Sequence, residues 1–272
     1  IKVFHNAKFD LKMLTQAGLQ INGQIFDTML AAQLLKAGLD KQKFLLQALA
    51  EEYLNELISK DEQTSDWEGE LTADQLTYAA KDAMILLPLR SILKKGLLKA
   101  KLAEVAKLEF DCVKVVALME FAGMRLDVEK WEVYGQAIEA RLQECIETLR
   151  EHVGVEINLN STQQLQKSLA GLGIEVTSTA RNVLTKHIGK HPVIDALVEY
   201  KKLSKLKSFI EALPKQINPV TNRIHPSYWQ VGSRAGRFSC SKPNLQQVPR
   251  SPEVRGCFVP DAGNTLVIAD YS

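Results

Sequence analysis

The most informative stretch of the chain reads Gly232-Ser-Arg-Ala-Gly-Arg-Phe-Ser-Cys-Ser-Lys-Pro-Asn-Leu-Gln-Gln-Val-Pro-Arg250. It is polar, basic and rich in residues that favour turns. Arginine binds phosphate as a planar fork, and asparagine and glutamine offer paired donors and acceptors to base edges. The stretch therefore predicts a surface that binds a polyanion.

Charge is unevenly distributed around this stretch. Residues 161–256 hold 15 Lys and Arg against 5 Asp and Glu, and the rest of the chain holds 19 against 27, although the overall net charge is only +2. A basic part beside an acidic part favours a polyanion-binding surface in the basic part. Ordinary solvated charge is the alternative.

Length and composition bound the remaining possibilities. A chain of 272 residues with 46% apolar residues predicts about two globular domains. No apolar run approaches the roughly 20 residues of a membrane span, so we expect no membrane partner.

The four cysteines have no paired spacing, which disfavours a zinc ribbon. Ile1 is not a start methionine, and the first residues resemble a buried strand, so we expect a fragment cut from a longer protein at both ends.

Residues 1 to about 100 predict an α/β arrangement. Strands are expected at 1–4 and 25–27, and helices at 7–17 (with Asn6 as the N-cap), 28–36, 43–58 and from Thr72 to about Lys94. Thr72 and Gln75 form a capping-box pattern.

The rest of the chain predicts mainly helices. They are expected at 103–122, 128–152, from Ser161 (which forms a capping-box pattern with Gln164) and from Pro192 to Leu213, with strands at 224–230 and at 264–269, the last ending at Asp270. The 103–122 helix is rich in apolar residues, among them Val105, Leu108, Cys112, Val115, Val116 and Met119, and we expect it to be a packing element.

Two carboxylates and a phenol are candidates for metal chemistry. Tyr78 and Asp82 are four residues apart on a predicted helix and therefore share a face. A metal held by carboxylates can activate water, and a phenol can orient that water. Taken singly, each aspartate is as well explained as a cap or a surface charge. The helix start at Ser161 is likewise either a phosphate site or a plain cap.

These strings resemble the motifs of a nuclease family. Asn6-x-x-Phe9-Asp10 and Tyr78-x-x-x-Asp82 resemble the second and third motifs of the DnaQ-like 3′–5′ proofreading exonucleases. The resemblance implies that Asp10 and Asp82 are metal-site carboxylates and that Tyr78 positions the attacking water. The first motif of the family, Asp-x-Glu on a strand, is not among these residues, so we expect no exonuclease activity from this chain alone.

From about Asn158 onward the sequence resembles the family A DNA polymerases. Four strings carry the resemblance in order: Asn158-x-x-Ser161-Thr-x-Gln-Leu165, Leu203-x-Lys205-Leu-Lys207, Ala235-Gly-Arg237-Phe-Ser239 running into Pro243-Asn-Leu-Gln246-x-x-Pro249, and Ala269-Asp270-Tyr-Ser272. The third departs from the usual Thr-Gly-Arg-Leu-Ser-Ser, and Lys242 stands where an aspartate is common. The first departure removes hydroxyl groups, Lys242 adds a positive charge, and neither changes the expected fold.

The resemblance implies a fold class of α/β plus α. A partial ribonuclease H-like exonuclease domain would occupy residues 1–100, a connecting helix and the start of the palm residues 101–128, a helical thumb residues 129–215, and the first part of an α+β palm residues 216–272.

The resemblance also implies site residues. Asp270 and the backbone carbonyl of Tyr271 would hold Mg²⁺. Primer–template DNA would be contacted near the primer end by Arg237, Asn244 and Gln246, with His225, Arg234 and Lys242 beside them, and along the thumb by Lys205, Lys207, Asn158, Ser161 and Thr162. For His225, a merely hydrogen-bonded imidazole is the alternative.

The implied function is that of a DNA-directed DNA polymerase with a proofreading-type domain. Its partners would be primer–template DNA and deoxynucleoside triphosphates, its cofactor Mg²⁺ in two-metal sites that are both incomplete here, its state monomeric, and its location the bacterial cytoplasm and nucleoid, or an organelle or virus. The 272 residues alone would bind primer–template and synthesise nothing. A stand-alone 3′–5′ exonuclease and a non-catalytic DNA-binding module are the alternatives.

Overall fold

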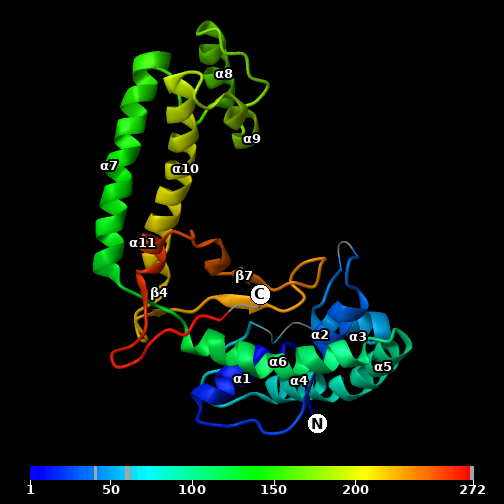
Figure 1. Ribbon diagram of the computed structural model, residues 1–272. Helices are drawn as coiled ribbons and strands as arrows, with labels where there is room; N and C mark the ends of the chain where they lie inside the picture. The colour runs from blue at the N-terminus through cyan, green and yellow to red at the C-terminus, as the bar shows by residue number, and fades with distance from the viewer. Residues whose placement is uncertain (40–41, 59–61, 63, 270–272) are drawn as a thin grey trace. The chain divides into compact units, whose positions relative to one another are not determined.

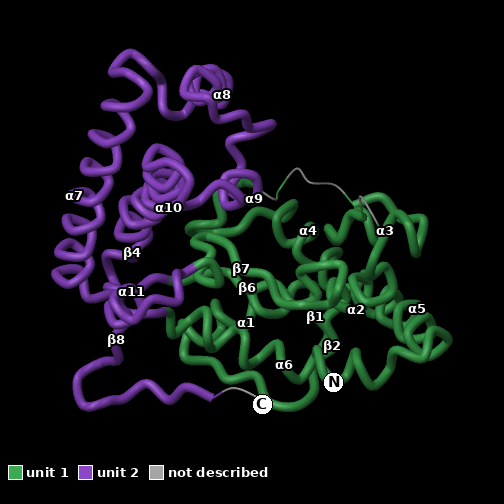
Figure 2. The backbone as a smooth tube through the Cα atoms, turned by 45° about the horizontal axis from the view of Figure 1, so that its top comes forward, with its two compact units in different colours: residues 1–123, 225–247 green, residues 124–224, 248–272 purple. Residues whose placement is uncertain are grey.

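The chain forms two compact units, coloured separately in Figure 2. The computed structural model describes residues 1–39, 42–58, 62 and 64–269. The first unit comprises Ile1–Gly123 together with His225–Gln247. The second comprises Met124–Ile224 and the residues from Val248 onward. No helix in the described ranges is both long enough and apolar enough to span a bilayer.

The first unit begins with a strand–helix–strand element, as predicted. Strands β1 (Lys2–Phe4) and β2 (Ile25–Asp27) are parallel, and Val3 lies opposite Phe26. The remaining elements are α1 (Ala7–Gln16), α2 (Thr28–Leu35), α3 (Leu46–Leu54), α4 (Ala73–Met84), α5 (Leu86–Lys99), α6 (Ala103–Ala122), β6 (Ser227–Trp229), β7 (Ser239–Ser241) and a 3₁₀ turn at Leu245–Gln247.

The core of the first unit lies between β1–β2 and helices α1, α2, α5 and α6. Its members include apolar side chains from these elements and from α3: Leu11, Phe26, Leu30, Leu49, Leu89, Leu93, Leu97 and Phe110. The rings of Phe26 and Phe110 are 4.8 Å apart, centroid to centroid. Burial of these side chains holds the helices on the small sheet.

Asp27 caps two helices at once. Its carboxylate accepts hydrogen bonds from the N–H groups of Met29 and Leu30 at the start of α2, and from those of Asn6 and Ala7 at the start of α1. The expected cap, Asn6, makes no side-chain capping bond and adopts a left-handed backbone. Asn6 is therefore the N-cap residue, as predicted, but its side chain makes no capping bond; the Asp27 carboxylate, 21 residues away, accepts from the N–H groups of Asn6 and Ala7.

Two predicted helices differ from the observed ones. The helix expected at 43–58 is confined to α3, and the flanking Leu45 and Leu57 are exposed. The helix expected from Thr72 to Lys94 is divided at Ile85 into α4 and α5. Pro88 explains the division, because proline lacks an N–H and its ring clashes with the carbonyl four residues earlier. The Thr72–Gln75 capping box is confirmed.

Helix α6 has the predicted bounds, and of the apolar residues named from the sequence only Val116 is buried. Leu108, Val115 and Met119 are exposed, whereas the buried residues are Ala106, Phe110, Val113, Val116, Ala117 and Glu120. Apolar residues occur all around this helix, so spacing alone did not identify the buried face.

The second unit is built on two long antiparallel helices, which lie side by side in Figure 1. These are α7 (Val128–Val153), capped by Asp127 as predicted, and α10 (Pro192–Ala212). The remaining elements are α8 (Thr162–Gly171), α9 (Arg181–Leu184), α11 (Pro252–Arg255) and the strand pairs β3 (Arg125–Leu126) with β8 (Phe258–Val259) and β4 (Ile217–Asn218) with β5 (Arg223–Ile224).

Trp131 is the centre of the second core. It is 1% exposed, and its indole N–H donates to the carbonyl of Ile210 at 3.0 Å. Its ring meets those of Phe209 and Phe258 edge to face, at 5.9 and 6.1 Å. One side chain on α7 thus joins the long helix pair to strand β8.

Predicted elements near the C-terminal end are only partly observed. The strand expected at 224–230 is divided into β5 and β6, with Pro226, which has no N–H to donate, between them. The strand expected at 264–269 is not formed, and Val267 and Ile268 are 87% and 89% exposed. No strand in the described ranges pairs with that segment, and a strand needs a neighbour to satisfy its backbone groups.

Candidate nucleic-acid interface and metal-binding residues

Residues 232–238, here called the basic loop, connect strands β6 and β7 of the first unit. Tyr228 lies opposite Cys240 in this hairpin. A Cβ at Gly232 would come within 2.7 Å of the Trp229 carbonyl oxygen, so only glycine fits there, and Gly236 has a positive φ of 71°. The loop presents Arg234 and Arg237 as exposed side chains.

The turn after β7 brings the predicted amide side chains to the basic loop. The Gln246 amide donates to the Phe238 carbonyl at 3.2 Å, and the Gln246 N–H donates to Asn244 Oδ1 at 3.1 Å. Lys242 is exposed, just before Pro243. The structure therefore brings Arg237, Gln246 and Asn244 together on one loop and turn, as the sequence predicts.

A buried carboxylate that the sequence analysis missed holds the base of this hairpin. Glu120 on α6 accepts from Lys8 at 2.8 Å, from Lys12 at 2.5 Å and from the N–H of Tyr228 at 2.6 Å. Burial by itself raises the pKa of the Glu120 carboxyl, but the bonds from Lys12, Lys8 and Tyr228 outweigh burial, and the pKa lies below its ordinary value. No local signal in the sequence marks Glu120 for this role, because its partners are 108 and 112 residues away along the chain.

His225 lies beside the same carboxylate residue. One of its ring nitrogens is 2.8 Å from the backbone carbonyl oxygen of Glu120. The imidazole is partly buried. This bond favours the hydrogen-bonded alternative for His225, and any contact with DNA would use the remaining ring edge.

Tyr78 and Asp82 are one turn apart on α4. Burial raises the pKa of the Asp82 carboxyl, and a hydrogen bond with the Tyr78 phenol opposes that rise. Asp82 Oδ1 is buried and has no hydrogen-bond partner in the described part of the chain. Tyr78 also lines an open cleft of about 790 Å³, with Glu56, Glu62, Asp74 and Lys81 among its walls.

Asp10 lies on α1, where burial and then the nearby Asp27 charge raise the pKa of its carboxyl. Carboxylate oxygens are the ligands that Mg²⁺ prefers, and the unpartnered oxygen of Asp82 fits a cation ligand. Within the described ranges, no three His, Cys, Asp or Glu side chains gather into a metal-binding group. Asp270 and Tyr271 lie outside the described residues.

The predicted phosphate contacts of the second unit are largely engaged in local bonds. Lys207 forms ion pairs with Glu139 and Glu211, whereas Lys205 is exposed. Ser161 Oγ caps α8 by accepting from the Gln164 N–H, and Thr162 Oγ1 accepts from the Thr179 hydroxyl.

One of the two hydrogen bonds of the predicted Ser161–Gln164 capping box, from the Ser161 N–H to the Gln164 side chain, is not formed, so this part of the prediction was wrong. Gln164 accepts from the N–H of Asn158 instead of that of Ser161. The same bond, with one from the Asn160 N–H to Asn158 Oδ1, occupies Asn158. These residues order the start of α8.

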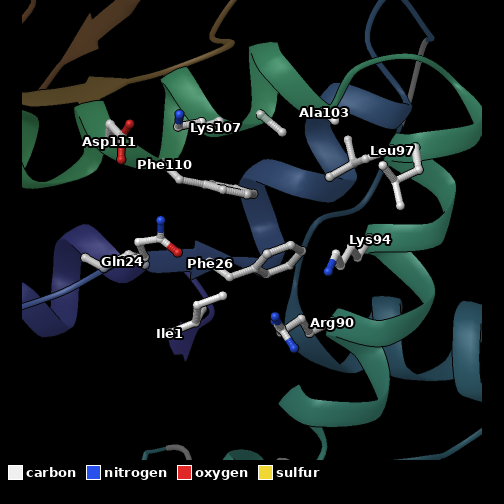
Figure 3. A pocket seen from close by; sticks show the side chains of 13 residues that line it. Ile1, Gln24, Phe26, Arg90, Lys94, Leu97, Ala103, Lys107, Phe110 and Asp111 are labelled. Atoms are coloured by element: carbon white, nitrogen blue, oxygen red, sulfur yellow. The ribbon is translucent and has the colours of Figure 1, made fainter.

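A separate apolar cavity of about 230 Å³ opens in the first unit (Figure 3). Phe26 and Phe110 form its walls, and Arg90, Lys94 and Lys107 supply cationic side chains around it. None of the predicted contact residues lines this cavity. It is therefore distinct from the basic loop.

His5, next to the nuclease-like motif, gives a testable titration. Burial lowers the pKa of His5 from 6.5 to about 4, against an opposing backbone bond at Phe44. The unfolded chain takes up this proton near pH 6.5 and the folded chain near pH 4. Stability is therefore expected to fall as pH drops through this window, by up to about 3 kcal/mol.

Proton NMR of the His5 ring should show a midpoint near pH 4. The His5→Gln variant should remove that signal and flatten the pH dependence of the melting temperature between pH 6.5 and 4. A midpoint near 6.5 would contradict the buried, neutral imidazole.

Comparisons with known proteins identify the family of the chain. The family model described as "DNA polymerase family A" matches residues 128–272, and the model described as "3'-5' exonuclease" matches residues 1–98. The first match covers more than half of the chain, which therefore belongs to DNA polymerase family A.

Similar relatives are bacterial enzymes named DNA polymerase I. The enzyme of Chloroflexus aurantiacus is 35% identical, and the match covers 100% of this chain and 31% of that enzyme. The enzyme of Synechocystis is 34% identical, and the match covers 100% of this chain and 30% of that enzyme. The chain thus spans about a third of these relatives.

A solved structure has the same fold. The POL domain of Pol1 from M. smegmatis, in complex with DNA primer-template and dNTP, aligns with a TM-score of 0.80 and 25% identity, over 96% of this chain and 46% of that one. The predicted fold class is confirmed.

Proposed function

We propose that this chain supplies part of the primer–template binding surface of a DNA-directed DNA polymerase. The observation that carries the proposal is the basic loop, where two exposed arginines stand on a glycine-dependent turn and Gln246, from the turn after β7, donates to the Phe238 carbonyl. Relatives named DNA polymerase I and a polymerase domain with primer-template support it.

The chemistry of the loop suits copying rather than sequence reading. Arg234 and Arg237 would contact phosphates, which position a duplex without specifying its sequence. Asn244 and Gln246 would donate to the minor groove, whose acceptors are similar for every base pair. Lys205, Lys207, Lys242, Asn158, Ser161, Thr162 and His225 would extend this contact along the duplex.

The metal sites of the longer enzyme would use carboxylates. Asp270, with the Tyr271 carbonyl, would hold Mg²⁺ for nucleotidyl transfer from deoxynucleoside triphosphates, and Asp10 and Asp82 would hold it in the nuclease-like part. Bound Mg²⁺ stabilises developing charge and activates water or hydroxyl nucleophiles. Tyr78, beside Asp82, would orient the attacking water.

The proposed domain assignment follows the expected boundaries. Residues 1–100 belong to the proofreading-type domain, 101–128 to the connection, 129–215 to the thumb and 216–272 to the palm. Since the relatives above are bacterial, we place the protein in the bacterial cytoplasm, as a monomer on DNA.

The Arg237→Ala variant tests the proposed DNA contact. Because one phosphate contact is lost, affinity for a primer–template duplex is expected to fall about tenfold at low salt, and the slope of log affinity against log salt should decrease by about one. Fluorescence anisotropy with a labelled primer–template measures both.

Lys95→Ala on α5 is the charge-matched control, because it removes an exposed cation remote in sequence from the loop. Equal losses from the two variants would contradict a specific loop contact. Tighter binding to single strands than to primer–template would favour the stand-alone nuclease, and indifference to a primer end would favour a plain DNA-binding module.

A further inference from the structure

The nuclease-like helix α1 reaches the polymerase-like hairpin through Lys8. The Lys8 ammonium donates to Glu120 on α6 at 2.8 Å and to the Tyr228 carbonyl on β6 at 2.6 Å. It also lies 4.2 Å from the centroid of the Trp229 ring. One side chain therefore contacts both the helix that supports the hairpin and the hairpin itself.

Lys12, one turn further along α1, differs from Lys8 in its contacts. Its ammonium donates to the other carboxylate oxygen of Glu120, and within the described part of the chain it forms no hydrogen bond or ion pair with the hairpin. The two lysines have the same charge and share Glu120 as a partner. Only Lys8 joins that partner to β6.

Helix α6 holds the hairpin at a second point. The Gln230 side chain, which is 5% exposed, donates to the backbone carbonyl of Glu109 at 2.8 Å and to its carboxylate at 2.6 Å. The cavity left beside Lys8, Tyr228, Trp229 and Gln230 measures only about 10 Å³. This contact is tightly packed on three elements of a single unit.

The Glu120 carboxylate is buried among several donors. Its side chain is 1% exposed, and the bonds from Lys8, Lys12 and the Tyr228 N–H together offset the cost of burying its charge. An apolar contact could supply similar stability. What the charged arrangement adds is a directional link between α1 and the strand that leads into the basic loop.

We infer that Lys8 is a positioning residue for primer–template binding: with Glu120 it fixes hairpin β6–β7 on α1 and α6 and so sets the place of the basic loop. The nuclease-like segment then has a second role, as the support of the DNA-binding loop, whether or not it degrades DNA. This inference rests on the proposed function of the loop.

The matched variants Lys8→Met and Lys12→Met test it in the 272-residue chain. Both remove one positive charge from the same helix, so general attraction to DNA changes equally. Lys8→Met is expected to weaken primer–template binding about tenfold, and Lys12→Met less than about twofold. Circular dichroism and melting temperature establish that both variants fold.

A double-variant cycle separates positioning from general destabilisation. If Lys8 acts through the basic loop, Lys8→Met should have less than about a twofold effect once Arg237 is already alanine. Glu120→Gln, which keeps the shape of the side chain, should resemble Lys8→Met in both backgrounds.

The outcomes distinguish failure of the positioning role of Lys8 from failure of the proposed DNA contact of the basic loop. Equal effects from the two lysine variants, or an undiminished effect of Lys8→Met in the Arg237→Ala background, overturn the inference. If Arg237→Ala itself leaves binding unchanged, the proposed contact of the loop fails instead. If Lys8→Met does not fold, Glu120→Gln provides the same comparison with Lys12→Met.

Discussion

Asp27→Ala is expected to lower the free energy of unfolding of the first unit by about 3–5 kcal/mol. The substitution strips four backbone N–H groups of their acceptor, two at the start of each of two helices. Loss of one helix cap costs about 0.5–2 kcal/mol, and a buried donor left without a partner costs about 1–3 kcal/mol. Denaturant unfolding followed by circular dichroism measures the loss.

Asp27→Asn refines this prediction. The amide keeps one oxygen as an acceptor, but its NH₂ group would face the N–H of Ala7 or those of α2, and two donors cannot bond each other. We expect this variant to lose more than half of the alanine effect. Thr72→Ala, which removes a cap at an exposed helix start, is the control and should cost about 1 kcal/mol. A loss from Asp27→Ala no larger than that from Thr72→Ala would contradict the double cap.

Trp131→Ala should destabilise the second unit by about 3–5 kcal/mol. The indole is fully buried against Phe209 and Phe258, and truncating such a side chain combines lost burial with a cavity. The Ile210 carbonyl also loses its donor. Thermal unfolding with a probe attached to the second unit would report the effect.

Trp131→Phe separates the two contributions. The ring packing is largely kept, whereas the bond to Ile210 is lost, so about 1–3 kcal/mol is expected. Val133→Ala on the same helix is the control, because Val133 is 68% exposed and should change stability by less than about 0.5 kcal/mol. A large effect from Val133→Ala, or none from Trp131→Ala, would place the core elsewhere.

Local sequence signals identified the elements that depend on neighbouring residues. The Thr72–Gln75 box, the Asp127 cap and the proline start of α10 involve contacts within a few residues, and all are present. The alternation of a strand, a helix and a strand in residues 1–27 is local in the same sense. Such features are set by backbone geometry that a short stretch determines alone.

Features that depend on distant partners were not predictable in this way. Nothing near Asn6 indicates that Asp27 caps its helix, and nothing near Glu120 indicates that Lys8 and Tyr228 complete its bonds. Residues 264–269 have strand-forming side chains, yet no described strand pairs with them. Strand pairing depends on tertiary contacts. The composition of residues 264–269 therefore indicated a tendency to form a strand, but not whether a partner strand lies beside it.

In the candidate site, too, local features were predictable from the sequence and contacts between distant residues were not. The resemblance to the polymerase motifs pointed to Arg237, Asn244 and Gln246, and these lie on one loop and the following turn because they are close in sequence. The spacing of Tyr78 and Asp82 placed them on one helical face. The lysine and glutamate that anchor the loop come from α1 and α6, and only the folded chain reveals them.

The discontinuous first unit has a consequence for the nascent chain. The ribosome makes Glu120 and then must add 108 residues before Tyr228, whose N–H completes the bonds of that carboxylate. At about 5–20 residues per second this takes on the order of 10 s. Meanwhile the inserted segment can close on itself, because Met124 and Ile224 at its two ends exchange backbone hydrogen bonds at 2.8 Å. Synthesis order therefore makes the hairpin the last piece of the first unit to be delivered, after the long helix pair has already left the exit tunnel.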